Sequence, residues 1–319
     1  MIKPDIYIQE AVKLENSKSV YEYMVKDLTL QRYEKISELY EKAGNIYKMT
    51  DKILSIDCMV KSYNYLIQTD YSFNSYKIKK LAGEIAELYK QIDFSKSIEY
   101  LEKVLNYYTI QGDVLGVIKT HEQIGEIYFD NEHFGEAKKI YFKIIELVNS
   151  SSKSFDIKKT VVEKLGEIYC RNESTISVNE LSNLYFSVGD DYLKKNNLMS
   201  KSLAKKYIFI GLLMDLASND FVKAKNNLNK YSSMYSILTN SNEDMFMSGI
   251  FDAVDTNDSE KISILSTQYN KISILTNLQV KLLLQIKANI DVFGDIDLCD
   301  DNNNNDTNDY NVIEEDDLC

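Results

Sequence analysis

The sequence predicts an all-α protein, a tetratricopeptide-like right-handed solenoid of antiparallel helical hairpins that a C-terminal helical bundle closes. The 319-residue chain has one proline and eleven glycines, so residues that break or weaken helices are rare along its whole length. Similar short segments recur about 40 residues apart, a period typical of stacked helix pairs. Apolar residues follow helical spacing between these segments.

The recurring segments share a glycine that precedes an apolar and aromatic stripe. They read AGNIYK at Ala43–Lys48, GEIAELYK at Gly83–Lys90, GEIYFD at Gly125–Asp130 and GEIYC at Gly166–Cys170. A small residue at a fixed place in each repeat lets two helices approach closely, and the tyrosine that follows it fills the neighbouring groove. The glycines that we expect to mark equivalent contacts are Gly44, Gly83, Gly125 and Gly166.

The second helix of each pair is amphipathic. Ser95–Tyr108 and Phe134–Val148 each carry apolar residues at i, i+3, i+4 and i+7, which gives one apolar face at helical spacing. Short polar links such as Gln111–Asp113 and Asp130–Glu132 separate successive helices, as an antiparallel helical hairpin requires.

The repeats loosen after about residue 175, and the remaining helices are expected to close the solenoid. Leu203–Ala217 is apolar almost all round, which predicts a central buried helix. The further helices are expected at Val222–Tyr231, Glu243–Asp255, Ser259–Asn270 and Ile272–Ile290. A closing element is needed because an open end would leave an apolar face in water.

The domain organisation that we expect is one α-solenoid domain with its C-terminal bundle over residues 1–291, followed by an acidic tail over 292–319. Asp300–Asn311 (DDNNNNDTNDYN) is a polar, acidic stretch of low complexity. Such a segment cannot offset its ordering entropy by burying apolar surface, so we expect an Asn/Asp-rich disordered tail.

No pattern of catalytic or metal-binding residues emerges from the sequence. His121 and His133 have no cysteine partner and fit no zinc spacing. Neither GxxxxGK[ST] nor GxGxxG occurs, and the Asp/Asn cluster of the tail lacks the central glycine and terminal glutamate of an EF-hand. We therefore expect no enzyme activity, no cofactor and no metal site.

Charge and cysteine content indicate a cytoplasmic protein that does not bind nucleic acid. The formal net charge is −12, whereas phosphate backbones require clustered lysine and arginine, although one face of an acidic solenoid can still be basic. The cysteines form no CxxC pair, and neither a signal peptide nor a run of 18 apolar residues occurs. They are Cys58, Cys170, Cys299 and Cys319.

A series of lysines falls near the same relative place in successive helical units. Its members are Lys119, Lys158, Lys159, Lys205 and Lys206. Two interpretations remain open at this point. They are ordinary solvated lysines, or they form a basic ladder complementary to an acidic helical bundle.

Several stretches resemble the alpha class of soluble NSF attachment proteins (SNAPs). They are YEKISELYEKAGNIYKM at Tyr33–Met49, Tyr89–Asp113, Leu203–Tyr231 and LLLQIK at Leu282–Lys287. The gamma class is an alternative, but its last helix lacks the Leu-Leu-x-Ile-Lys ending. A generic tetratricopeptide scaffold that binds a short peptide is another alternative, although we find no carboxylate clamp of Asn, Lys and Arg.

The resemblance implies an adaptor that associates peripherally with membranes. Several copies of such a protein bind an assembled SNARE four-helix bundle, then recruit and stimulate the hexameric AAA ATPase NSF for SNARE disassembly in vesicle fusion. By position, Lys119, Lys159 and Lys205 match family lysines that face the SNAREs. The basic residue expected after Gly112 is Asp113 here.

The resemblance also implies functional residues near both ends of the chain. The family's membrane-touching loop corresponds to VYEYMV, which keeps Tyr21, Tyr23 and Met24 but can equally be part of an N-terminal helix. The family's penultimate leucine, which stimulates NSF, has two counterparts. Leu318 is penultimate in EEDDLC, and Leu298 lies at about the family's distance from the Leu-Leu-x-Ile-Lys helix.

Overall fold

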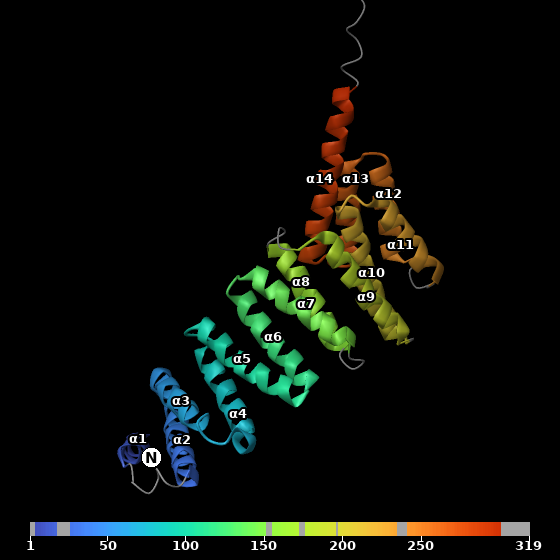
Figure 1. The fold of residues 1–319 in the computed structure, drawn as a ribbon. Coiled ribbons are helices and arrows are strands. Elements are labelled where there is room, and N and C mark those ends of the chain that lie inside the picture. Colours follow the sequence, from blue (N-terminus) through green and yellow to red (C-terminus); the bar gives the residue numbers. More distant parts are fainter. Residues whose placement is uncertain are drawn as a thin grey trace, which may run out of the picture. The chain divides into compact units, whose positions relative to one another are not determined.

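The computed structural model describes residues 4–17, 26–150, 155–171, 176–195, 197–234 and 241–300, and these residues form helices joined by turns, without a strand (Figure 1). The all-α class is thereby confirmed. The chain divides into two compact units, residues 1–154 and residues 155–319. The single domain expected over residues 1–291 stays a prediction.

The first unit is a series of consecutive antiparallel hairpins. Its helices are α1 (Pro4–Asn16), α2 (Lys26–Tyr47), α3 (Lys52–Leu66), α4 (Tyr71–Tyr89), α5 (Phe94–Gln111), α6 (Val114–Asp130) and α7 (Phe134–Ser150). Each helix contacts its neighbours in the chain, which is the local stacking of a tetratricopeptide-like array. Gly112 caps the C-terminal end of α5 in the left-handed conformation with φ 68°, and the next residue, Asp113, is the N-cap of α6.

The hairpins repeat their hydrogen bonds as well as their helices. Asp51 caps α3 and Asp93 caps α5: the Asp51 carboxylate accepts the N–H groups of Ile53 and Leu54, and the Asp93 carboxylate accepts that of Lys96. Four residues after each cap, a buried serine donates to a carbonyl of the preceding helix: Ser55 to Gly44 and Ser97 to Ala86, both at 2.8 Å. Gly44 and Ala86 are therefore equivalent positions.

This equivalence corrects the expected series of glycines, because Ala86 rather than Gly83 occupies the close-approach position of the second repeat. Ala86 is 1% exposed, whereas a Cβ at Gly83 would have no neighbour nearer than 3.9 Å. A Cβ at Gly44 would lie 3.0 Å from Met59, and one at Gly125 would lie 2.7 Å from the Tyr141 ring. The repeating pattern is a small residue three places before a tyrosine, as in Gly125–Tyr128.

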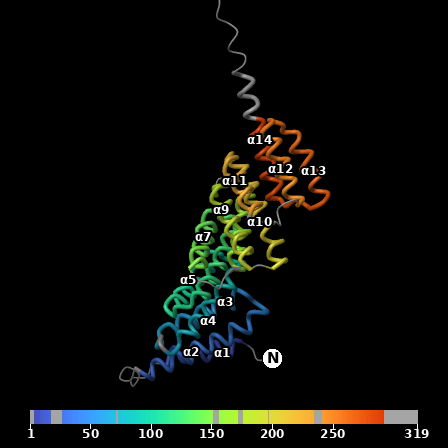
Figure 2. Tube along the Cα trace, turned by 90° about the vertical axis from the view of Figure 1, so that its right-hand side faces the viewer, coloured from blue at the N-terminus to red at the C-terminus, as the bar shows by residue number. Residues whose placement is uncertain are grey.

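The second unit packs around one central helix. Its helices are α8 (Phe155–Arg171), α9 (Val178–Lys194), α10 (Leu198–Ala217), α11 (Phe221–Met234), α12 (Asn242–Asp255), α13 (Ser259–Ile272) and α14 (Asn277–Asp300). Every residue from Tyr207 to Ala217 is buried, and α10 contacts α9, α11 and α14. The central buried helix is therefore confirmed. Figure 2 shows α12, α13 and α14 together towards the C-terminal end of this unit.

The boundary between the last two helices differs from the expectation. Ile272 ends α13 instead of beginning the last helix, because Ser273 is extended with φ −141°. Thr276 and Gln279 then bond reciprocally, backbone to side chain, which forms a capping box at the start of α14. The helix continues to Asp300, past residue 292 where we expect the tail to begin. Residues 301–319 lie outside the described part of the chain.

Candidate partner-binding face

The three lysines that the family resemblance assigns to SNARE binding lie on three even-numbered helices. Lys119 is exposed on α6, while Lys159 on α8 and Lys205 on α10 are half-buried. Within the described ranges, neither Lys119 nor Lys159 forms an ion pair. Both charges are therefore available to a partner.

Lys205 is engaged inside the second unit. Its Nζ lies 2.7 Å from the Glu243 carboxylate on α12, and that carboxylate is 17% exposed. Burial is the largest single influence and would raise the pKa of Glu243, but the hydrogen bond and the charge of Lys205, together with hydrogen bonds from the Glu243 backbone N–H and from Ser241, hold this pKa below its usual value. The pair ties α10 to α12, so the Lys205 charge is already matched.

Two other members of the lysine series have opposite environments. Lys158 is 5% exposed, and its Nζ lies 2.6 Å from both Asp191 and Ser187 on α9. The interpretation that Lys158 belongs to an exposed basic ladder was therefore wrong. Lys206 is exposed on α10 and lines a groove. The exposed lysine of the pair on α10 is Lys206, one position after the lysine that the sequence favoured.

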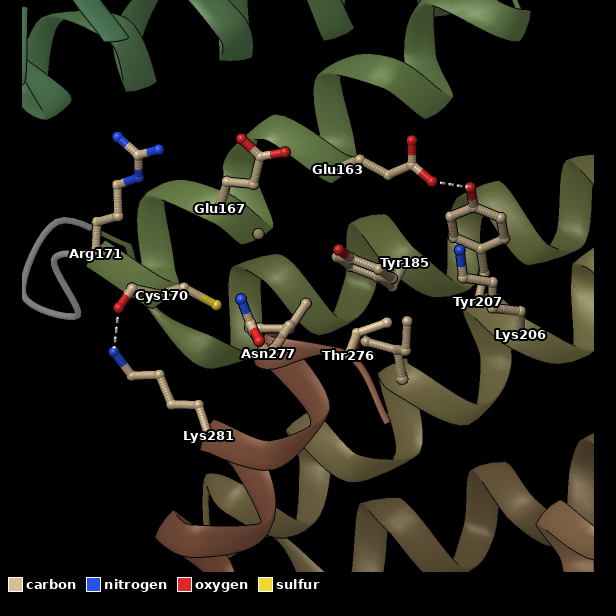
Figure 3. Close-up of a pocket in the computed structure, with 13 residues that line it drawn as sticks. Glu163, Glu167, Cys170, Arg171, Tyr185, Lys206, Tyr207, Thr276, Asn277 and Lys281 are labelled. Atoms are coloured by element: carbon tan, nitrogen blue, oxygen red, sulfur yellow. Dashed lines mark hydrogen bonds between the residues drawn. The ribbon is translucent and has the colours of Figure 1, made fainter. Parts of the chain in front are cut away.

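A groove of about 790 Å³ opens between α8, α9, α10 and the start of α14 (Figure 3). Its apolar floor comes from Tyr185, Tyr207, Ile210 and Leu278, and Cys170 contributes a thiol. Gly166 makes room for this floor, because a Cβ there would lie 2.5 Å from the Tyr185 hydroxyl and 3.1 Å from Leu278. The aromatic floor can therefore accept a large apolar side chain from a partner.

The two tyrosines of the floor are neutral. Burial raises the pKa of both the Tyr185 and the Tyr207 phenols far above the usual value. The Tyr207 hydroxyl also donates to Glu163 at 2.5 Å, as Figure 3 shows, and this carboxylate raises the Tyr207 pKa further. The floor thus keeps its apolar character at any physiological pH.

Charged side chains of both signs surround the groove, which suits a polypeptide partner better than a single small ion. Glu163, Glu167 and Arg171 come from α8, and Lys206 comes from α10. Lys281 of α14 donates to the backbone carbonyls of Tyr169 and Cys170, at 3.1 and 2.7 Å, and so caps the C-terminal end of α8.

The groove depends on contacts between distant parts of the chain. Besides the Lys281 bonds, the Tyr169 hydroxyl donates to Gln285 at 2.5 Å, which attaches α14 to α8 across 116 positions of sequence. Sequence analysis missed this groove because no local pattern reports which helix covers α8. The capping box at Thr276 was the one sequence signal that marks the helix start at its edge.

The histidines lie elsewhere, in the first unit. His121 is buried, its Nδ1 lies 2.9 Å from the Val117 carbonyl, and burial lowers its pKa. The His133 ring lies with its centre 5.2 Å from that of the Phe94 ring, and the two planes are tilted by 36°. Within the described part of the chain, no three His, Cys, Asp or Glu residues are grouped so that they could hold a metal ion.

The predicted residues at the two ends of the chain lie beyond what the structure describes. Tyr21, Tyr23 and Met24 fall in the undescribed residues 18–25, and Leu318 falls in 301–319. Leu298 lies within α14, but the structure describes only its backbone and not its side chain. None of the described helices combines the length and apolar composition that crossing a bilayer requires.

The architecture defines this chain as a tetratricopeptide-like helical-repeat protein with a polypeptide-sized groove in its second unit. The family model for the soluble NSF attachment proteins (SNAP) matches residues 3–291. The chain belongs to the SNAP family, whose relatives are adaptor proteins rather than enzymes.

Named relatives match the chain over most of its length. The vesicular-fusion protein SEC17 of Komagataella phaffii is 26% identical over 281 residues, 81% of this chain and 86% of its own. The beta-soluble NSF attachment protein of Bos taurus is 25% identical, covering 84% of this chain and 88% of its own. Among solved structures, the apo form of RapI covers 88% of this chain and 90% of its own, at 15% identity and a TM-score of 0.36.

Proposed function

We propose that this protein is an adaptor that binds assembled SNARE bundles and recruits and stimulates the NSF ATPase, without enzymatic activity of its own. The observation that carries the proposal is the SNAP family match over residues 3–291. The relatives named for vesicular fusion and NSF attachment support the same role. Several copies act on one SNARE complex, peripherally at a membrane in the cytoplasm.

Lysines on the even-numbered helices, exposed at Lys119 and half-buried at Lys159, supply the SNARE contact. Lys119 and Lys159 form no ion pair with the described residues and can meet the acidic surface of a helical bundle. On α10, Lys206 supplies the charge, because Lys205 is matched by Glu243. The groove beside Lys206 receives an apolar side chain of the bundle. The lysine charges then speed the association of the two proteins, and burial of the apolar side chain slows their dissociation.

Pull-down with soluble SNARE bundles tests this contact. The double variant Lys119→Ala/Lys159→Ala should weaken binding by about tenfold, with the loss shrinking as salt screens the remaining charge. The control is Lys139→Ala/Lys225→Ala, which removes one exposed lysine from each unit on odd-numbered helices. Equal binding by both double variants would contradict the assignment.

A second pair of variants separates the two lysines of α10. Lys206→Ala should weaken SNARE binding about threefold without changing the free energy of unfolding. Lys205→Ala should instead lower that free energy by about 1–2 kcal/mol, because Glu243 loses its partner in a mostly buried position. Reversed effects would restore Lys205 as the binding residue.

NSF hydrolysis of ATP in the presence of SNARE bundles tests the second half of the role. We propose that Leu318 at the acidic terminus engages NSF, with Leu298 as the alternative. Leu318→Ala should abolish stimulation while SNARE binding stays intact, and Leu298→Ala should not. Failure of the unaltered protein to stimulate NSF would leave only a helical-repeat scaffold that binds peptides.

A further inference from the structure

Cys170 on α8 presents a thiol to the groove between α8, α9, α10 and α14, as Figure 3 shows. The residue is half-buried and forms no disulfide with another described cysteine. The SNARE contact proposed above uses the aromatic floor and Lys206, so the thiol has no role in it. The groove measures about 790 Å³, within the roughly 300–1,000 Å³ that small-molecule sites occupy. A ligand of tripeptide size can therefore lie beside the thiol.

A second polar group points into the same groove and has no hydrogen-bond partner among the described residues. Tyr185 is 3% exposed, and Figure 3 shows its hydroxyl directed to the side of the groove where Cys170 lies. Gly166 leaves this hydroxyl uncovered, because a Cβ there would lie 2.5 Å from it. Buried hydroxyls are normally hydrogen-bonded. The Tyr185 hydroxyl is therefore available to an acceptor that a ligand brings into the groove.

The charges around Cys170 favour its thiolate. The C-terminal end of a helix disfavours negative charge, but Lys281 offsets this effect, because its ammonium donates to the Cys170 carbonyl at 2.7 Å. Arg171 adds a second cation at the next position. Glu167, one turn earlier, is paired with Lys164 at 3.0 Å. Partly exposed thiols beside cations are the reactive ones in proteins.

The other cysteine whose side chain is described has the opposite environment. Cys58 is 2% exposed in the core of the first unit, and burial raises its pKa to about 11. A buried thiol in apolar surroundings is inert towards disulfides, because the thiolate is the nucleophile. Cys58 is therefore an internal control for reactivity at Cys170.

We propose that Cys170 is a modification site, which forms a mixed disulfide with a small zwitterionic peptide thiol of the glutathione class. Such a peptide carries two carboxylates and one ammonium. The groove offers both matching signs, with Lys206 and Arg171 for the carboxylates and Glu167 for the ammonium. The Tyr185 hydroxyl donates to a carbonyl or carboxylate of the peptide, which holds the disulfide against Cys170.

The reaction is a thiol–disulfide exchange, and its co-reactant is the oxidised peptide, glutathione disulfide. Cys170 loses its proton to water, and its thiolate attacks one sulfur of the reagent. A bond forms from Sγ to that sulfur while the sulfur–sulfur bond of the reagent breaks. The leaving peptide thiolate takes up a proton. Cys170 is thereby oxidised and half of the reagent is reduced, so reduced glutathione reverses the step.

The modification has a consequence for SNARE binding that rests on the proposed function. The peptide occupies the groove that would otherwise receive an apolar side chain of the SNARE bundle. An oxidising cytoplasm therefore weakens SNARE binding, and reduction restores it. The site itself does not depend on this consequence.

Peptide mapping by mass spectrometry tests the site without SNAREs or NSF. The full chain is incubated with glutathione disulfide, quenched with acid and digested with trypsin without reduction. The peptide should be found on Leu165–Arg171, which carries Cys170, and appear there at least about tenfold faster than on Ile53–Lys61, which carries Cys58. Cys299 and Cys319 share the fragment 288–319 and are read separately. Equal rates on the first two fragments would overturn the proposal.

A second comparison separates binding by the groove from simple accessibility of the thiol. Tyr185→Phe and Lys206→Ala should each slow modification by glutathione disulfide about threefold or more, yet leave the rate with the small neutral hydroxyethyl disulfide within about twofold. Lys225→Ala, which removes an exposed lysine of α11, is the matched control and should change neither rate. Equal slowing with both reagents, or none with glutathione disulfide, would show that the groove does not bind the peptide.

SNARE pull-down connects the site to the adaptor role and keeps their failures apart. The modified chain should bind SNARE bundles about fivefold less than the unmodified chain and recover after treatment with dithiothreitol. Cys170→Ser should bind the same amount before and after incubation with glutathione disulfide. Absence of SNARE binding by the unmodified chain would refute the proposed function, while peptide mapping still decides the site. Undiminished binding by the modified chain would refute the control of SNARE binding through the groove.

Discussion

Single side chains in this protein divide into those that hold helices together and those that remain available to partners, and adjacent residues can differ completely. Lys158 and Lys159 follow one another on α8, yet Lys158 is 5% exposed and bonded to Asp191, whereas Lys159 is half-buried and forms no ion pair with a described residue. Lys194 also reaches Asp191, at 2.7 Å. Asp191 therefore carries the electrostatic contact between α8 and α9.

Lys158→Met should destabilise the protein by about 2–3 kcal/mol, because Asp191 would lose its better buried partner and keep only the exposed Lys194. The measurement is the midpoint of urea denaturation monitored by circular dichroism. Lys159→Met is the matched control and should change the free energy of unfolding by no more than about 0.5 kcal/mol. Similar midpoints for the two variants would show that the buried pair adds nothing.

The lowered pKa of the Asp191 carboxylate makes the free energy of unfolding depend on pH. Burial alone would raise the pKa of Asp191, but hydrogen bonds from Lys158 and Lys194 outweigh it and lower this pKa below its usual value. A lowered folded-state pKa adds stability above the unfolded-state pKa of about 3.9 and loses it as the pH falls through the folded value. The difference in urea midpoint between the unaltered chain and Lys158→Met should therefore be constant near pH 7 and shrink below about pH 4.

Asp215 is a second residue of this kind, buried in α10 with no exposed surface. It bonds to Ser182 on α9, and to Lys223 at 2.7 Å and Asn227 at 2.8 Å on α11. Asp215→Ala should cost about 3–5 kcal/mol, because these partners would be left unmatched around a buried cavity. Urea denaturation again measures the change, and a loss below about 1 kcal/mol would show that water replaces the carboxylate.

At the scale of elements, the repeat works because one small residue per hairpin lets the next helix close in. A Cβ at Gly125 on α6 would lie 2.7 Å from the ring of Tyr141 on α7, and Tyr141 is 2% exposed with no room to turn away. Gly125→Ala should therefore destabilise the protein by about 1–3 kcal/mol through overpacking, despite the better helix propensity of alanine.

Gly135→Ala is the matched control for that variant, because nothing lies within 4 Å of a Cβ at this exposed position of α7. It should leave the thermal midpoint unchanged or raise it slightly, as alanine gains up to about 1 kcal/mol over glycine in a helix. If both alanine variants melted together, close approach of α6 and α7 would not depend on Gly125.

Helices were predictable from the sequence because their apolar spacing is local, but their contacts were less so. The error at Gly83 was a shift of three residues, which preserves a helical face and so cannot be seen in periodicity alone. On α10, Lys205 and Lys206 point in directions about 100° apart around the helix axis. Because this helix is apolar on nearly every side, its sequence does not show which of the two directions faces solvent. The groove joins α8 to α14 across more than a hundred residues, and no local pattern encodes that pairing.

At the scale of the whole molecule, most of the net negative charge lies in one segment at the C-terminal end. Residues 292–319 hold ten of the 49 acidic residues and none of the 37 basic ones, so they carry −10 of the net charge of −12. The remaining 291 residues are nearly neutral overall. The charge of the chain is thus no obstacle to a basic SNARE contact on its helices, and its acidic part is placed where the proposed NSF contact lies.

Deleting residues 301–319 should therefore separate the two activities of the proposed adaptor. The thermal midpoint should stay within about 2 °C, since the deletion leaves every described helix intact. Affinity for acidic SNARE bundles should rise a few-fold at low salt, because seven carboxylates no longer repel the bundle, and the gain should vanish near 1 M salt, where charges interact over about 3 Å only. NSF stimulation should be lost together with Leu318. Retained stimulation in the truncated chain would assign NSF engagement to Leu298 instead, and unchanged SNARE affinity at low salt would show that the tail does not reach the bundle-binding lysines.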